Sequence, residues 1–294
     1  MNKILVTNGQ GQWLETEFHE PQLPKLGIVV ESLMTGVCRS DVDMAQGKFQ
    51  LLPPGMSGHE GLGRVIESND DSTAVGAIVA TRGEPAYADR YAAVAGTYVS
   101  VPEVAARYIL EPVACGINVV LQNYQALLSK AGGRLAILGT GFLSQVIVRT
   151  LELKDLTFDI DVIGNHNRDK FQNLHSDLLG QYDVVIDLSS RTDYLTTADN
   201  LNNNALIILG SEKTLINFNL GPLLWKSTTI QFPSPRNPNF IDSMIQAKIW
   251  IENGSLIVDN FWTQAYNRTT QWQQAFEHAA NRQPGYSRGY ICWQ

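Results

Sequence analysis

One stretch decides the fold of this 294-residue chain: Arg134-Leu-Ala-Ile-Leu138 runs directly into Gly139-Thr-Gly141-Phe-Leu-Ser144. An apolar run, a glycine turn and an apolar-periodic segment predict a strand, a tight turn and a helix, the order of a dinucleotide-binding site. Gly139 permits the turn, and Gly141 lets the backbone approach a pyrophosphate at the helix N-terminus. Ser144 replaces a third glycine and is small enough for close packing of helix on strand. The alternative is an ordinary turn.

Strand-like and helix-like segments alternate after this stretch, which predicts a parallel α/β sheet. We expect its strands at residues 134–138, 158–163, 182–188, 205–209 and 228–232. The first 110 residues instead carry short alternating runs between Gly and Pro residues, which predict an irregular β domain. Towards the C-terminus we expect a helix over 238–251, a strand near 256–258, a helix over 270–281 and a last strand that returns to the first domain.

Composition excludes several classes of protein. Lys and Arg total 22 against 29 Asp and Glu, so the formal net charge is −7, and no basic stretch predicts binding to nucleic acid or to an anionic membrane. No apolar run approaches the roughly 18 residues of a membrane span. Three cysteines and the lack of a leader-like N-terminus predict a cytoplasmic protein without a disulfide framework.

Two glycine-rich segments of the first domain carry metal-binding residue types. Cys38-Arg-Ser-Asp41 and Gly58-His59-Glu-Gly-Leu-Gly63 supply a thiol, an imidazole and carboxylates, which are zinc ligands. Their spacing matches no short zinc-finger pattern. From the residues alone, a small buried cysteine and a histidine hydrogen-bonded in a turn remain the alternative.

Together with Glu111-Pro-Val-Ala-Cys115-Gly, and in this order, these segments resemble the zinc-dependent medium-chain alcohol dehydrogenases. The resemblance extends over the whole chain. It implies an α/β protein with an irregular, β-rich GroES-like catalytic domain and a shortened Rossmann domain, a doubly wound parallel sheet. The catalytic domain would span residues 1–117, completed by 252–294, and the Rossmann domain 118–251.

The resemblance also implies a set of zinc ligands. Cys38 and His59 match two ligands of the catalytic zinc, and the third is either Cys115 or Glu111. We favour Cys115 because a thiolate is the softer and stronger zinc donor. Glu60 matches an acid beside the metal that can orient the site or transiently join it. No cysteine lies between His59 and Cys115, so we expect one catalytic zinc and no structural zinc.

Other positions imply roles in proton transfer and cofactor binding. Ser40 matches the first group of a proton relay. Asp43 stands where the family often has a histidine; it either passes the proton on to solvent or is only a loop acid. Arg39 resembles a residue that contacts the cofactor pyrophosphate. Arg288 resembles one that reaches the cofactor phosphates or pairs with the acid after the first ligand.

The end of the second Rossmann strand bears on the choice of cofactor. Counting alone places the acid that binds the NAD ribose at Asp159 or Asp161, but the resemblance places Asn165 there. Without that carboxylate, Arg168 or Lys170 could bind a 2′-phosphate. We therefore expect NADP(H) rather than NAD(H); the alternative is that these cations only begin a solvated helix.

Only eleven residues separate Lys170 from Tyr182, where the family has a further strand and helix, so we expect one edge α/β unit to be missing.

The predicted function is a zinc-dependent alcohol dehydrogenase or carbonyl reductase. Its partner is a small alcohol or carbonyl substrate, and the resemblance implies a homodimer. Alternatives are a zinc-free quinone or enone reductase and a non-catalytic nucleotide-binding relative. Candidates for the pocket lining are Phe49, Leu51 and Met56.

Overall fold

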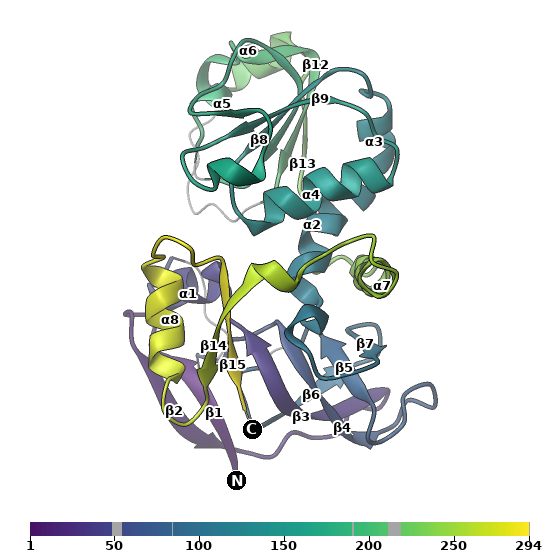
Figure 1. Ribbon diagram of the computed structural model, residues 1–294, viewed down its shortest axis with the longest axis vertical. Coiled ribbons are helices and arrows are strands. Elements are labelled where there is room, and N and C mark those ends of the chain that lie inside the picture. The colour runs from purple at the N-terminus through teal and green to yellow at the C-terminus, as the bar shows by residue number, and fades with distance from the viewer. Residues whose placement is uncertain (49–54, 84, 190, 211–218, 294) are drawn as a thin grey trace. The chain divides into compact units, whose positions relative to one another are not determined.

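The computed structural model describes residues 1–48, 55–83, 85–189, 191–210 and 219–293, and it divides the chain into two compact units (Figure 1). The first unit comprises Met1–Ala114 and Met244–Gln294, and the second comprises Cys115–Ser243. Within the described ranges, no helix is long and apolar enough to cross a membrane. The mixed α/β class expected from the sequence is confirmed.

The first unit is built on a seven-stranded sheet. Six of its strands follow the order β14-β15-β3-β4-β5-β7, and the seventh, β6, pairs with β3. A separate pair, β1 and β2, is antiparallel. The bounds are β1 Asn2–Thr7, β2 Trp13–Phe18, β3 Gly27–Gly36, β4 Gly61–Ser68, β5 Ile78–Thr81, β6 Arg90–Val94, β7 Tyr98–Val101, β14 Trp262–Asn267 and β15 Arg288–Cys292, with helices α1 Arg39–Ala45 and α8 Trp272–Ala280.

The C-terminal strand returns to the first domain, as expected. β15 pairs antiparallel with β3, so that Ile291 lies opposite Thr35. The strand predicted near residues 256–258 is wrong: Leu256 and Val258 are buried, but they belong to a loop. The Leu256 amide donates to the carbonyl of Trp250, near the end of α7 (Phe240–Glu252). Alternating apolar residues here fill the core instead of pairing with a strand.

A turn after β4 depends on one carboxylate. Asp70 accepts hydrogen bonds from the Tyr98 hydroxyl (2.5 Å), from both the amide and the hydroxyl of Ser72, and from Thr73. These donors, the Tyr98 hydroxyl first, lower the pKa of Asp70 from 3.8 to about 2. The turn is therefore stabilised by the charged form of Asp70.

Tyr98→Phe removes the strongest of these donors and should lower the free energy of unfolding by about 1 kcal/mol at neutral pH. A carboxyl whose pKa is lower in the folded than in the unfolded chain stabilises the fold above the unfolded value and loses that contribution as the pH falls through the folded value. The difference between variant and wild type should therefore shrink between about pH 4 and pH 2. Urea unfolding at several pH values measures this, and a difference independent of pH would refute it.

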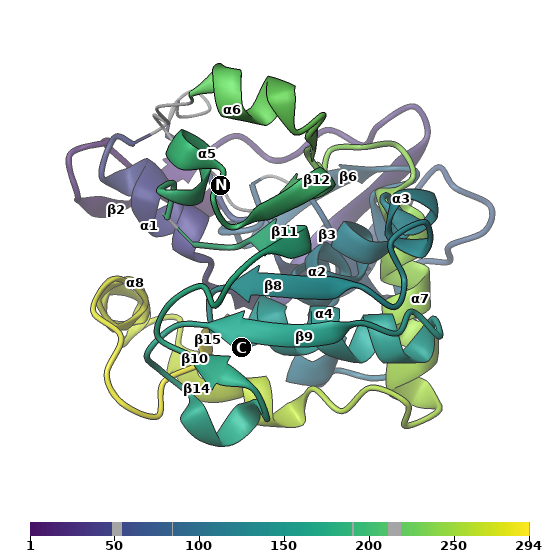
Figure 2. The ribbon, with the colours of Figure 1, turned by 90° about the horizontal axis from the view of Figure 1, so that it is seen from above.

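The second unit is built on a parallel sheet of six strands in the order β10-β9-β8-β11-β12-β13 (Figure 2). The strands are β8 Arg134–Leu138, β9 Asp159–Ile163, β10 Leu174–His175, β11 Tyr182–Asp187, β12 Leu201–Leu209 and β13 Thr229–Gln231. The helices are α2 Glu111–Leu121, which begins in the first unit, α3 Tyr124–Leu128, α4 Phe142–Leu153, α5 Tyr194–Thr197 and α6 Leu220–Trp225. Apolar residues of α4 spaced four apart, such as Phe142 and Val146 or Ile147 and Leu151, are buried.

The expectation of five strands is wrong, because β10 adds a sixth. Its two residues pair in parallel with the end of β9, Leu174 with Val162 and His175 with Ile163. The strand order is therefore the complete 3-2-1-4-5-6 order of a doubly wound sheet. Between β9 and β11, where every residue is described, the only helix is the single 3₁₀ turn η2 (Arg168–Lys170). The edge unit is thus reduced to two paired residues, too few to leave a periodic signal in the sequence.

Candidate active site

Cys38 lies between β3 and α1, at the N-cap of the helix. Its backbone amide donates to the Asp41 carboxylate (3.2 Å), which closes the first turn of the helix. His59 and Glu60 come from a second loop that leads into β4. The antiparallel pairing of β3 with β4, in which Thr35 lies opposite Gly61, brings the two loops together.

Cys38, His59 and Glu60 form a group whose potential ligand atoms all lie within 4.8 Å of one another. Thiolate, imidazole and carboxylate are the donors that zinc takes in proteins. The three residues expected beside the metal are therefore side by side, and their chemistry fits a zinc ion.

Glu60 is fully buried and forms an ion pair with Arg288, whose Nη2 approaches both carboxylate oxygens. Gly36 faces this pair without a side chain, because the Cβ of any larger residue would occupy the position of a Glu60 carboxylate oxygen. The Arg288 guanidinium also lies over the Trp262 ring, 5.4 Å from its centroid. Burial alone would lower the pKa of Arg288, but Glu60 raises it above its ordinary range. Arg288 thus neutralises the acid next to His59.

The His59 ring is held between two residues of α1. Its Nδ1 lies 3.6 Å from Oδ1 of Asp41, and its Nε2 lies 3.5 Å from the Ser40 hydroxyl. Burial opposes a charge on the ring, but the carboxylates of Asp41 and Glu111 outweigh burial and hold the pKa of His59 well above its ordinary value. The negative surroundings favour a cation at this position.

Asp43, the second candidate for the proton relay, forms two ion pairs. Its Oδ1 lies 3.1 Å from Nε of Arg39 and 2.7 Å from Nζ of Lys48. Arg39 also donates to the Ala280 carbonyl at the end of α8 (3.4 Å). No hydrogen bond joins Ser40 to Asp43 in the described part of the chain.

The two candidates for the third zinc ligand lie on one helix. Glu111 begins α2 in the first unit, and Cys115, the first residue of the second unit, follows one helical turn later. Residues four apart share one face of a helix, so both side chains project from the same side of α2.

Three residues were candidates for the lining of the substrate pocket. Phe49 and Leu51 lie outside the described residues, whereas Met56 packs against the core beside β1.

In the second unit, the glycine turn leaves the N-terminus of α4 open. Gly139 has φ +123°, which L side chains rarely adopt. Gly141 is the N-cap of α4, and the first turn carries no acid. Among the described residues, no atom beyond its two chain neighbours lies within 4 Å of where its Cβ would be. The Ser144 hydroxyl donates to the Gly139 carbonyl (2.8 Å) and fastens the helix to the turn. An uncapped helix N-terminus of this kind suits a phosphate group.

The segment after β9 presents polar side chains to solvent. Asn165 is exposed, and exposed Lys170 lies 3.1 Å from the Asp169 carboxylate. Arg168 begins η2. Asp159, at the other end of β9, and Asp161, which is buried, are the two acids that counting favours.

Asp161 belongs to a network that the sequence did not reveal. It binds the guanidinium of Arg134 (2.6 Å), the hydroxyl of Tyr182 (2.9 Å) and Nε2 of His175 (3.2 Å). These partners give each carboxylate oxygen of buried Asp161 at least one polar contact within the protein. Because they lie 14 to 27 positions away in the chain, no local motif could indicate them.

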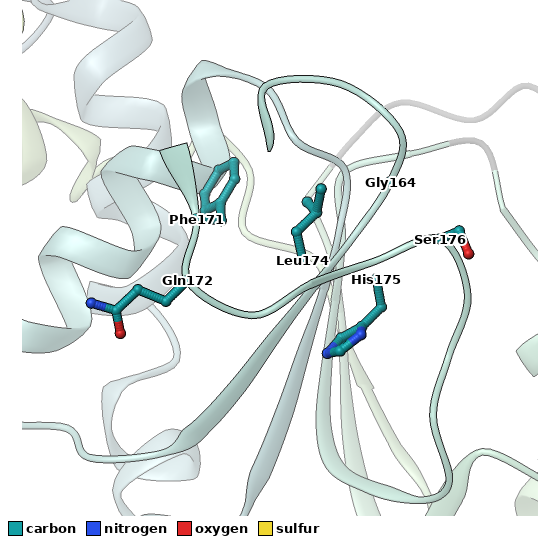
Figure 3. Close-up of a pocket in the computed structure, with 6 residues that line it drawn as sticks. All are labelled: Gly164, Phe171, Gln172, Leu174, His175 and Ser176. Atoms are coloured by element: carbon teal, nitrogen blue, oxygen red, sulfur yellow. The ribbon is translucent and has the colours of Figure 1, made fainter. Parts of the chain in front are cut away.

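Asn167 joins this segment to the glycine turn. It adopts a left-handed conformation, with φ +52°, and its side-chain amide donates to the Thr140 carbonyl (2.6 Å). A cavity of about 460 Å³ lies next to the segment that follows β9. In Figure 3, the side chains of Phe171 and Leu174 point to one side of the chain and that of His175 points to the other. The lining of the cavity comprises Gly164, Phe171, Gln172, Leu174, His175 and Ser176.

Comparisons with known proteins agree with this geometry. Residues 25–119 match the family model of the alcohol dehydrogenase GroES-like domain. No curated protein matches the sequence. The solved structures that share the fold include Staphylococcus aureus TarJ in complex with NADPH, with a TM-score of 0.81, 16% identity and coverage of 100% of this chain and 99% of TarJ.

Two further structures with this fold are named dehydrogenases. Bacillus subtilis 2R,3R-butanediol dehydrogenase has a TM-score of 0.78 and 14% identity, with complete coverage of both chains. Escherichia coli L-idonate 5-dehydrogenase has a TM-score of 0.76 and 16% identity, with coverage of 99% of this chain and 98% of the other. The chain therefore has the fold of the medium-chain alcohol dehydrogenases. Within it, residues 25–119 match the alcohol dehydrogenase GroES-like domain, in agreement with the resemblance seen in the sequence.

Proposed function

We propose that the protein is a zinc-dependent alcohol dehydrogenase or carbonyl reductase that transfers a hydride between a nicotinamide dinucleotide and a small alcohol, aldehyde or ketone. The observation that carries the proposal is the group formed by Cys38, His59 and Glu60 in an alcohol dehydrogenase GroES-like domain. Cys38 and His59, with a third donor from α2, would give the three protein donors and one open position of a catalytic zinc site.

In this proposal Cys38 and His59 hold the zinc with a third donor from α2, either Cys115 or Glu111. Bound zinc would supply a Lewis acid that stabilises negative charge on the substrate oxygen. Arg288 holds Glu60 as a buried, neutralised pair, which leaves Cys38 and His59 as the firmer donors. The Ser40 hydroxyl, next to His59, would accept the alcohol proton at Oγ while its own proton passes to water, and in the reverse direction it would protonate the alkoxide formed when a carbonyl is reduced.

The glycine turn and the N-terminus of α4 would bind the dinucleotide pyrophosphate through backbone amides. Nicotinamide would donate or accept the hydride. One structure with this fold supports this part of the proposal, since TarJ is described in complex with NADPH.

We further propose a preference for NADP(H), because Asn165 places an uncharged side chain after the end of β9. Asn165→Asp adds a carboxylate that repels a 2′-phosphate and can bind a 2′-hydroxyl. The Kd for NADPH should rise about tenfold and that for NADH should fall. Fluorescence titration of the reduced nucleotides measures both.

Asn203→Asp is the matched control for this change, because Asn203 is exposed near the start of β12 in the same unit. It adds the same charge at the opposite end of its strand and should leave both Kd values unchanged. Equal effects of the two variants on NADPH would show that net charge, not the position of Asn165, sets the preference.

Zinc analysis of protein purified without chelators, together with NADPH and NADH titrations, tests the proposed function. About one zinc per chain, NADPH binding and reduction of members of a carbonyl panel are expected. NADPH binding without zinc would indicate a metal-free reductase instead. Binding of neither zinc nor nucleotide would refute the proposal.

A further inference from the structure

Tyr87 lies at the centre of the loops that carry the proposed zinc ligands. It is fully buried, and its ring makes edge contacts with Trp13 and Phe276, at centroid distances of 5.9 and 5.2 Å. The ring also packs on Gly58, whose Cβ, if present, would lie 2.7 Å from it. Gly58 has φ +91° and directly precedes His59, so the tyrosine ring fixes the path of this loop.

The Tyr87 hydroxyl reaches the other segment of the site, on both sides of Cys38. It lies 2.8 Å from Oδ2 of Asp41 and 3.0 Å from the carbonyl of Gly36, which is two residues before Cys38. A hydroxyl has one proton to donate, and a carboxylate is the stronger acceptor. The donated hydrogen bond therefore goes to Asp41.

The Asp41 side chain is fully buried, so its carboxylate depends on hydrogen-bond donors from the protein. Besides Tyr87, it accepts the backbone amides of Cys38 and Gly58, each at 3.2 Å. No lysine or arginine pairs with it among the residues that the structure describes. Tyr87 is thus one of a small number of groups that keep the carboxylate in place.

The oxygen of Asp41 that Tyr87 does not bind faces Nδ1 of His59, at 3.6 Å. A carboxylate in this position fixes the orientation and the tautomer of a metal-binding histidine, and it leaves the other ring nitrogen for the metal. We propose that Tyr87 is a positioning residue: through Asp41 it holds the His59 ring so that Nε2 is presented to zinc. This inference rests on the proposed function.

Tyr87→Phe tests the inference, because it keeps the ring and its packing and removes only the hydroxyl. Zinc affinity measured by competition with a chelating dye should fall about tenfold, as for other groups that orient metal ligands. The visible spectrum of the cobalt-substituted protein should also change, since it reports the geometry around the metal. Both readouts are independent of any substrate.

Tyr91→Phe is the matched control. Tyr91 is equally buried in the same unit, and its hydroxyl bonds to Thr81 (2.7 Å) instead of a site residue. This variant should keep wild-type zinc affinity and the wild-type cobalt spectrum. Equal losses in both variants would mean that general destabilisation, not positioning, is responsible, and would overturn the inference.

Asp41→Asn provides a second test that does not depend on one variant alone. If Tyr87 acts through Asp41, Tyr87→Phe should cost affinity in the wild type and little more in the Asp41→Asn background. Additive losses would overturn the inference. Wild-type affinity in Tyr87→Phe would overturn it as well and leave the proposed function intact, whereas a wild-type protein that binds no zinc would overturn both.

Discussion

Cys38→Ser is expected to abolish stoichiometric zinc binding and to lower turnover about a thousandfold. Cys38 is the thiol of the metal-binding group, and a serine hydroxyl is a poor zinc donor at neutral pH. Stabilisation of charge by the metal is worth several kcal/mol, and every ~1.4 kcal/mol changes the rate tenfold. Elemental analysis and the rate of NADPH oxidation with a responsive carbonyl compound measure the two effects.

Cys292→Ser is the control for this experiment. Cys292 is also partly buried and ends β15 in the same unit, but it is not part of the metal-binding group. The Cys292→Ser variant should bind as much zinc as the wild type and keep most of its activity. Full zinc content in Cys38→Ser would contradict the proposed ligand set.

Arg288→Met is expected to reduce the free energy of unfolding by about 3–5 kcal/mol. The change leaves Glu60, which is fully buried, without the cation that neutralises it. The cost is that of an uncompensated buried charge, which exceeds the net contribution of the intact pair. Urea-induced unfolding followed by tryptophan fluorescence measures it.

The double variant Glu60→Gln with Arg288→Met separates these two quantities. With both charges removed, the free energy of unfolding should recover by at least half of the loss seen in Arg288→Met. An unchanged loss in the double variant would show that Arg288 stabilises the fold through its packing on Trp262 and not through Glu60.

Local sequence patterns predicted most of the architecture. The strand at 134–138 agrees residue for residue with β8, because glycines on both sides of the apolar run mark its ends. The return of the last strand to the first domain was also predicted. The two-residue strand β10 was not, since its partner and not its own sequence defines it.

The candidate site, too, was predicted only in part from the sequence. Sequence motifs indicated Cys38, His59 and Glu60, and in the structure these residues lie close together. Arg288 was identified, but its pairing with Glu60 spans 228 positions. The contact of Tyr87 with Asp41 spans 46 positions, and no motif indicates it. Such partners follow from tertiary packing, which short-range patterns do not encode.

The reduced edge of the six-stranded sheet also affects how copies of the chain can associate. An open edge strand is a template for strand addition and aggregation. Here β10 covers only the last two residues of β9, but the Asn173 side-chain amide donates to the Ile160 carbonyl (3.4 Å), and exposed Asp159 adds a charge. A carbonyl already bonded and a carboxylate at the edge hinder the docking of a foreign strand. Reduction of the edge unit to β10 therefore leaves an edge that disfavours strand addition.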